Sequence, residues 1–152
     1  MNALCVISAM TIGLLAGSLS LEGLVLVPYW RSLRSDAFAD LHMGFAPRLY
    51  RFFAPLTAAA TSMSLASGFA VAWIAEREAA DWLTVASAVL AASLLAFYRL
   101  YFRSANERLP VLAAANDDAA LSAELRRWQR IHLVRTAVSV AAFVLAMLGF
   151  VG

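Results

Sequence analysis

Four long apolar stretches separate the polar parts of the chain. They cover residues 3–27, 52–74, 82–102 and 131–151, and each has the roughly 20 residues that a helix needs to cross the ~30 Å hydrocarbon layer of a bilayer. Only helices and closed barrels satisfy every backbone polar group there, and these stretches are too long and too uniformly apolar for barrel strands. The pattern predicts an all-α fold, a four-transmembrane-helix bundle that forms a single integral membrane domain over residues 1–152.

The first polar connection also shows a helical pattern. Phe38, Leu41, His42 and Phe45 recur at the spacing of one helical face, and Ser35 before them is a candidate N-cap. This pattern predicts a short helix that lies on the membrane surface and ends before the second span.

The third and fourth helices are predicted to extend into the cytoplasm. Asn116, Asp117 and Asp118 form a helix-start signal, and no Gly or Pro follows before the fourth span. A single helix from about Asp118 to Phe150 would be roughly 48 Å long, so its first turns would project from the membrane. The third helix should run a few residues past the membrane and end at Pro110.

The charges indicate how the helices are oriented. All 12 basic residues are Arg, the 10 acidic residues leave a formal charge of +2, and only 14% of the chain is charged. Eleven Arg residues lie in or beside the two long connections, and only Arg77 lies in the turn between the second and third spans. The positive-inside rule therefore predicts a multi-pass protein of the cell inner (plasma) membrane, with cytoplasmic connections and both termini outside. Membrane topology explains the Arg residues better than binding of nucleic acid does.

Glu22 is the first candidate functional residue. It lies five residues before the end of the first span, which is about 8 Å below the cytoplasmic surface at helical rise. An ionisable group at that depth is expensive and is a functional hypothesis by default. The alternative is a structural or snorkelling carboxylate.

A second set of polar residues follows one side of the fourth helix. Trp128, His132, Arg135 and Ser139 are spaced i, i+4, i+7 and i+11. His132 can act as a general base, and Arg135 needs an acidic or oxyanion partner because it stays charged. The alternatives are an interface anchor for Trp128, a polar interface residue for His132 and topology control alone for Arg135.

The cytoplasmic end of the third helix adds Arg99 and Asn106, although Asn106 could simply cap the helix. These residues, Glu22 and the fourth-helix set should converge on one apolar pocket with a few polar groups. We predict that Glu22 meets the His132–Arg135 face. The predicted catalytic residues are His132, Arg135, Glu22 and Asn106, and the predicted substrate-binding residues are Trp128, Arg99 and Ser139.

The sequence predicts neither a metal site nor a bound cofactor. The two His residues and one Glu lack the spacing of metal ligands, and phosphate loops and dinucleotide fingerprints are absent. The single Cys5 excludes an internal disulfide and the Cys-x-x-Cys chemistry of membrane thiol oxidoreductases. His42 is expected to be a half-buried packing residue.

The chain resembles the anthrone-oxygenase-like membrane family. The first span of that family is similar to the pattern Leu21-Glu22-Gly23 followed by Pro28. A later part of the family's sequence is similar to Asn106-x-x-Leu109 followed by Trp128-x-x-x-His132-x-x-Arg135. The resemblance implies four spans and a cofactor-independent oxidoreductase that acts on polyketide-like aromatic molecules. His132 or Glu22 would remove a proton from the substrate, and Arg135 with Asn106 would stabilise the resulting oxyanion.

Two other functions stay open at this point. A small proton-coupled transporter would also use a Glu in its first helix, and a non-enzymatic accessory membrane protein would need neither His132 nor Arg135. The expected partners are the lipid bilayer and an apolar aromatic small molecule. Gly13 and Gly17 form a G-x-x-x-G motif, which indicates close helix packing within the bundle or in a homo-oligomer.

Overall fold

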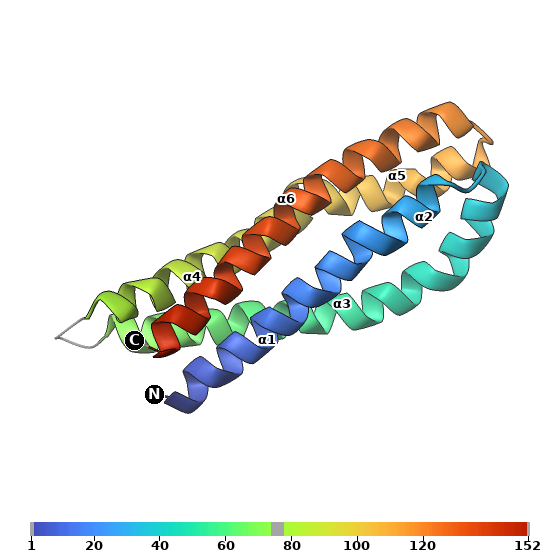
Figure 1. Cartoon of the computed structure of the whole chain (residues 1–152). Helices are drawn as coiled ribbons and strands as arrows, with labels where there is room; N and C mark the ends of the chain where they lie inside the picture. The colour runs from blue at the N-terminus through green and yellow to red at the C-terminus, as the bar shows by residue number, and fades with distance from the viewer. Residues whose placement is uncertain (1, 74–77, 152) are drawn as a thin grey trace.

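The computed structural model describes residues 2–73 and 78–151, and every regular element in these ranges is helical, as predicted. Four long helical segments lie side by side (Figure 1). The first comprises α1 (Asn2–Leu21), the π-helical turn η1 (Glu22–Leu26) and α2 (Val27–Arg31). The second is α3 (Ser35–Ala72). The third comprises α4 (Ala79–Phe97), the π-helical turn η2 (Tyr98–Phe102) and α5 (Arg103–Ala114), and the fourth is α6 (Asp118–Val151).

Three of the helices in the described ranges are long and apolar enough to cross a membrane. They are Ala3–Arg31, Ala79–Ala114 and Asp118–Val151. The C-terminal half of α3 is less apolar because Thr and Ser residues interrupt it, at positions 57, 61, 62, 64 and 67. The protein is therefore an all-helical protein of membrane type. Arg77, on which the predicted topology partly rests, lies outside the described residues.

α3 corrects the prediction of a short surface helix followed by a separate span. It is one helix of 38 residues that continues through Pro47 and Pro55. A proline removes one backbone hydrogen bond, and the intact turns on either side keep the helix continuous while it bends. Figure 1 shows that the N-terminal part of α3 curves toward the end of α2. Ser35 is the first helical residue, not the N-cap, because Arg34 adopts the extended capping conformation.

The prediction that the third helix ends at Pro110 is wrong. α5 continues through it to Ala114, and the buried side chains of Leu109 and Ala113 hold this part of the helix against the core. The chain turns at Asn116, whose φ of 54° lies in the left-handed region that Asn tolerates better than most residues. α6 begins at Asp118 and ends at Val151, within one residue of the prediction.

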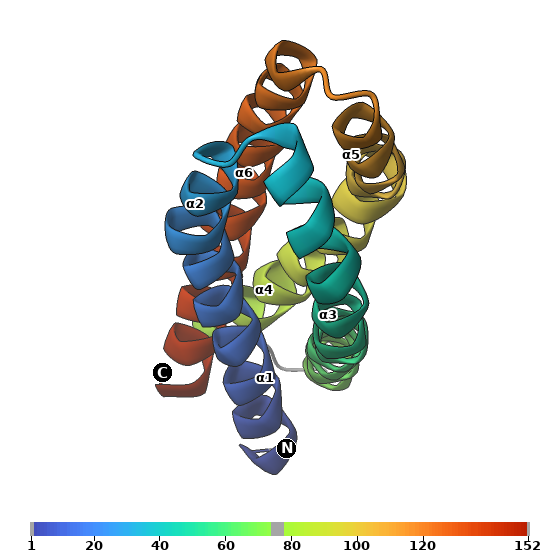
Figure 2. The same ribbon diagram turned by 90° about the vertical axis from the view of Figure 1, so that its right-hand side faces the viewer.

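The core has two parts with different side chains. Toward the termini, which lie at the same end of the bundle (Figure 1), the buried residues are mainly Ala and Leu. Toward the connections they include four large aromatic side chains, Trp30, Phe38, Phe102 and Trp128. In the view of Figure 2, the N-terminal part of α3 lies between α2 and α5, and α3 packs against α5.

Candidate functional site

A cavity of about 580 Å³ lies at the aromatic end of the bundle. One wall is a continuous face of α3, and the opposite wall is a face of the third helix at positions 95, 98, 99, 102, 103, 106, 107 and 109. Glu22 and Trp30 from the first helix and Trp128 and Arg135 from α6 complete the lining. The volume is in the range of small-molecule sites, which are mostly apolar with a few placed polar groups.

Both π-helical turns border this cavity. η1 begins at Glu22, and η2 contains Arg99 and Phe102, all of which line the cavity. A π turn widens the helix and shifts its side chains by one position relative to the α-helix before it, and such turns are frequent at functional sites. The hydrophobic pattern did not predict either π-helical turn, because the residues before and after each turn are similarly apolar.

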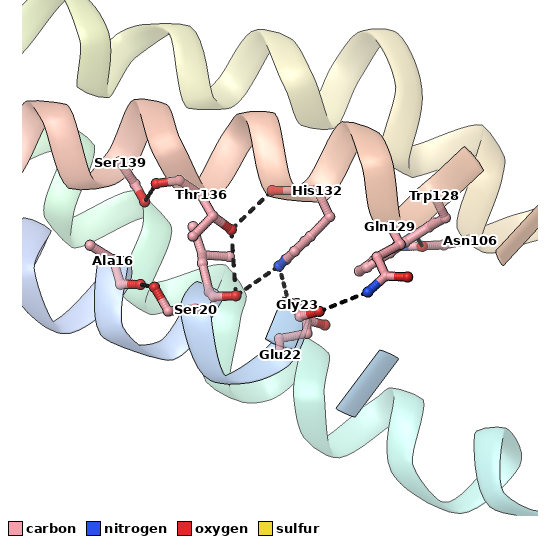
Figure 3. Close-up of polar contacts among 11 residues, drawn as sticks. Ala16, Ser20, Glu22, Gly23, Asn106, Trp128, Gln129, His132, Thr136 and Ser139 are labelled. Atoms are coloured by element: carbon pink, nitrogen blue, oxygen red, sulfur yellow. Dashed lines mark hydrogen bonds and ion pairs between the residues drawn. The ribbon is translucent and has the colours of Figure 1, made fainter. Parts of the chain in front are cut away.

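Glu22 and His132 meet in the interior, as the sequence predicted (Figure 3). The Glu22 Oε2 atom lies 3.8 Å from His132 Nε2, and the two residues are 7% and 0% exposed. His132 Nε2 lies 2.9 Å from the Leu19 carbonyl oxygen. Because a carbonyl only accepts hydrogen bonds, this nitrogen carries the proton and donates it. His132 Nδ1 is buried without a hydrogen-bond partner.

Close packing fixes the imidazole of His132. Its ring is stacked on Trp128, with ring centroids 4.7 Å apart and an angle of 11° between the planes. A Cβ at Gly23 would lie 2.8 Å from His132 Cδ2, so any larger residue there would displace the ring. His132 is not among the residues that line the cavity. It therefore lies behind Glu22, which does line it.

Arg135 lines the cavity and is only 9% exposed. Its Cζ atom lies 5.0 Å from the centre of the Phe102 ring, a cation–π arrangement. Arg135 and Glu22 interact electrostatically but form no ion pair, and Arg135 Nε has no hydrogen-bond partner. The guanidinium is thus held in place while its nitrogens stay available to an anion.

Asn106 and Trp128 are joined by a hydrogen bond from Trp128 Nε1 to Asn106 Oδ1, 2.9 Å long. Both side chains line the cavity. Asn106 is not a helix cap, since α5 continues to Ala114. Trp128 is 4% exposed and contacts Trp30 and Phe102, so it is a core residue and not an interface anchor.

The other predicted binding residues lie in different places. Arg99 lines the cavity. Ser139 is fully buried, its hydroxyl donates to the Thr136 carbonyl at 2.7 Å, and it is not part of the cavity lining.

Sequence reasoning missed the α3 wall and Phe102. The signal for the wall was present, since Phe38, Leu41, His42 and Phe45 continue at the same helical spacing to Leu49 and Phe53. The spacing was used to predict only a short surface helix, separate from the second span, whereas α3 continues through Pro47. Phe102 gave no signal, because an aromatic residue at the end of a span is typical of the membrane interface.

His42 lies on the α3 wall, where its ring is stacked on Phe38 with centroids 5.2 Å apart. Burial lowers the pKa of this imidazole below its ordinary value, so it is neutral at pH 7. Among the residues that the structure describes, no group of three His, Cys, Asp or Glu side chains could hold a metal ion.

Comparison with known proteins identifies a family. The sequence model of the anthrone oxygenase family matches residues 47–145, which is more than half of the chain. The matched range includes Arg99, Asn106, Trp128, His132 and Arg135, whereas Glu22 lies outside it. No curated protein and no solved structure matches the chain.

Proposed function

Because this chain belongs to the anthrone oxygenase family, we propose that it oxidises a flat, apolar aromatic substrate in the cavity at the aromatic end of the bundle. The observation that carries the proposal is the placement of Glu22 and Arg135. These two groups of opposite charge both line a largely apolar cavity without forming an ion pair with each other. A carboxylate can accept a proton there, and a guanidinium can stabilise an oxygen anion.

The first step is a proton transfer. An anthrone carries an acidic methylene group opposite its carbonyl, and Glu22 removes one of these protons. The negative charge moves to the carbonyl oxygen of the resulting enolate. Arg135 stabilises this oxygen through nitrogens that Phe102 holds toward the cavity. The buried position strengthens the interaction because little water competes for it.

The remaining steps use dioxygen, which is the oxidant and receives the electrons. The carbanionic carbon forms a bond to one oxygen atom, and the other oxygen takes the proton from Glu22 to give a hydroperoxide. Glu22 then removes the second proton from the same carbon while the O–O bond breaks, and the departing hydroxide takes this proton from Glu22 and leaves as water. The products are a new carbonyl group and one water molecule, so the methylene carbon is oxidised and one dioxygen is consumed for each substrate.

The geometry supports Glu22 as the base in preference to His132. The Nε2 proton of His132 is donated to Leu19, and the ring is not part of the cavity lining. His132 is a positioning residue in this proposal: it lies 3.8 Å behind the Glu22 carboxylate and limits its movement. Asn106 fixes the Trp128 ring, which forms part of the cavity lining.

The proposal includes a four-span topology in the inner membrane, with both termini outside. α3 packs against α1 and α4, both parts of helices that can cross a membrane. A bilayer that surrounds these neighbours would also surround the C-terminal half of α3. The Arg residues around the two long connections favour the cytoplasm for the cavity end.

The proposed function can be tested with purified protein in lipid nanodiscs and an anthrone as the substrate. Oxygen uptake and anthraquinone formation are measured against heat-denatured protein, which gives the rate of uncatalysed oxidation. Glu22→Gln and Arg135→Gln should each lower the catalysed rate, by about 10²–10⁴-fold for the lost base. Glu107→Gln, at the mouth of the same cavity, is the matched control and should retain most of the rate.

Two outcomes would contradict the proposal. Wild-type protein that oxidises no anthrone faster than the denatured control would favour a non-enzymatic accessory protein. Proton-gradient-dependent uptake of an aromatic compound into vesicles, without its oxidation, would favour a transporter.

A further inference from the structure

The charged residues that line the cavity do not balance. Three are arginines, Arg99, Arg103 and Arg135, and two are glutamates, Glu22 and Glu107. His42 adds no charge at pH 7 because burial lowers the pKa of its imidazole. One positive charge is therefore in excess.

The excess charge can be assigned to one residue. Arg103 pairs with Glu107, with Nε and Oε1 3.7 Å apart. Arg135 and Glu22 interact electrostatically across the inner end of the cavity. The Arg99 side chain forms no ion pair and no hydrogen bond with any other residue that the structure describes. It is the cation that remains without a counter-charge.

The proposed reaction does not supply the missing anion. When Glu22 takes a proton from the substrate, its negative charge moves to the substrate, and the total charge in the cavity stays the same. Arg135 neutralises that charge before and after the transfer. Arg99 has no carboxylate partner throughout, and because its side chain lines the cavity and is exposed, it can bind an anionic group of a ligand.

We infer that the substrate carries a permanent carboxylate, separate from its reacting carbon, and that Arg99 binds this group. This inference rests on the proposed function and narrows its substrate class from apolar aromatic molecules to monoanionic ones. The η2 turn supports it, because Arg99 and Phe102 project into the same cavity from one π-helical turn. The aromatic rings would lie against Phe102 and Trp128, with the carboxylate on Arg99 beyond them.

The inference can be tested by binding alone, with two probes of equal size. Anthraquinone-2-carboxylate carries the charge and anthraquinone-2-carboxamide does not. Both quench tryptophan fluorescence, and Trp30 and Trp128 line the cavity. Affinities are measured in nanodiscs of phosphatidylcholine, and the ratio of the two affinities is compared between variants, so that partitioning of the probes into lipid cancels.

Wild-type protein should bind the carboxylate about tenfold or more tightly than the carboxamide, because a hydrogen bond to a charged group contributes this much. Arg99→Gln should abolish that preference and leave the affinity for the carboxamide unchanged. Arg103→Gln is the matched control, since it removes the same charge from the same face one turn away. It should keep most of the preference.

Three results would overturn the inference. The first is equal affinity of wild-type protein for the two probes while an uncharged anthrone is still oxidised, which leaves the proposed function intact. The second is an equal loss of preference in Arg99→Gln and Arg103→Gln, which would show general electrostatics without a specific contact. The third is an Arg99→Gln variant that still prefers the carboxylate probe but retains less phosphatidylglycerol during purification than wild type does. That result would assign Arg99 to the binding of a lipid phosphate. If neither probe binds and no anthrone is oxidised, the proposed function fails as well.

Discussion

The two ends of the bundle are built from the same helices and differ in the size of their buried side chains. Toward the termini, Ala60, Ala91, Ala142 and Ala146 let the helices approach closely. At Gly68, an added Cβ would lie 2.7 Å from the Cβ of Ala88. Toward the connections, large aromatic side chains hold the helices apart. The pocket at the packed end lies between α1 and α6 and is lined by apolar side chains and Gly13 alone, whereas the cavity at the aromatic end also has charged side chains in its lining.

Polar groups follow the same division. At the packed end, hydroxyl groups bridge neighbouring helices: Ser8 donates to Ser64 at 3.1 Å, and Ser87 donates to the Ala142 carbonyl at 2.7 Å. Small polar residues of this kind hold membrane helices together. At the cavity end, the side chains of Arg99 and Arg135 line the cavity and form no such hydrogen bonds with the other residues that the structure describes. In this bundle, small residues allow the helices to pack closely at one end, and large aromatic residues keep the helices further apart at the end that has the cavity.

The largest expected effect comes from adding volume to the packed end. Gly68→Leu should destabilise the protein by about 3 kcal/mol, because α3 and α4 must separate to admit the side chain. Gly17→Leu is the matched control, since a Cβ at Gly17 meets nothing within 4 Å. Thermal unfolding in detergent measures both. Equal melting temperatures for the two variants would show that the packed end is not close-packed at Gly68.

A single methyl group should disturb the contact between the first helix and His132. In Gly23→Ala the new Cβ would displace the His132 ring, so we expect a loss of about 1–3 kcal/mol in stability and a lower rate of anthrone oxidation. Gly44→Ala, where a Cβ meets nothing within 4 Å, should be neutral or stabilising because alanine favours the helix. A Gly23→Ala variant with wild-type rate and stability would contradict the positioning role of His132.

Adding volume at the cavity end should affect binding and not stability. Ala54 lines the cavity, so Ala54→Phe should weaken binding of anthraquinone-2-carboxamide by about tenfold, which is about 1.4 kcal/mol, with little change in melting temperature. Ala59→Phe is the control, because Ala59 is exposed on the same helix and does not line the cavity. If Ala54→Phe unfolds the protein as Gly68→Leu does, the two ends do not differ as described.

The smallest effect concerns Asp118, which accepts hydrogen bonds from the Ser35 backbone N–H at 2.8 Å and from the Ser35 hydroxyl at 2.5 Å. These bonds hold the pKa of the carboxyl below its ordinary value. Its contribution to stability is therefore present above that value and lost as the pH falls through the folded-state pKa. Asp118→Ala should lower the melting temperature by a few degrees at pH 7, and the difference should shrink below pH about 4.

Asp36→Ala is the control for that experiment, since Asp36 bonds only within its own turn of α3. A constant difference between wild type and Asp118→Ala from pH 7 to pH 3 would show that the charge of Asp118 contributes nothing. The result matters for the cavity, because Asp118 joins the start of α6 to the start of the α3 wall.

The sequence by itself determined the helices and most of the residues at the site. Apolar stretches of about 20 residues allow only helices in a bilayer, and the start of α6 could be predicted because Asn116, Asp117 and Asp118 combine a tolerated left-handed turn with capping groups. The meeting of Glu22 with His132 could also be predicted. An ionisable side chain inside a membrane span raises the free energy of the protein. Two such side chains at the same depth in neighbouring helices stabilise each other only if both face the interior of the bundle.

Only the tertiary structure decided how those residues divide between the cavity and its surroundings. Helical spacing puts His132, Arg135 and Ser139 on one side of α6, yet only Arg135 lines the cavity. The reason is that the position of a side chain relative to a cavity depends on the neighbouring helix: Gly23 lets the first helix cover His132, and the η2 turn brings Phe102 beneath Arg135. The continuation of α3 through Pro47 was likewise decided by tertiary packing. A proline inside a helix costs about 3 kcal/mol or more, and the packing of the turns on either side offsets this cost.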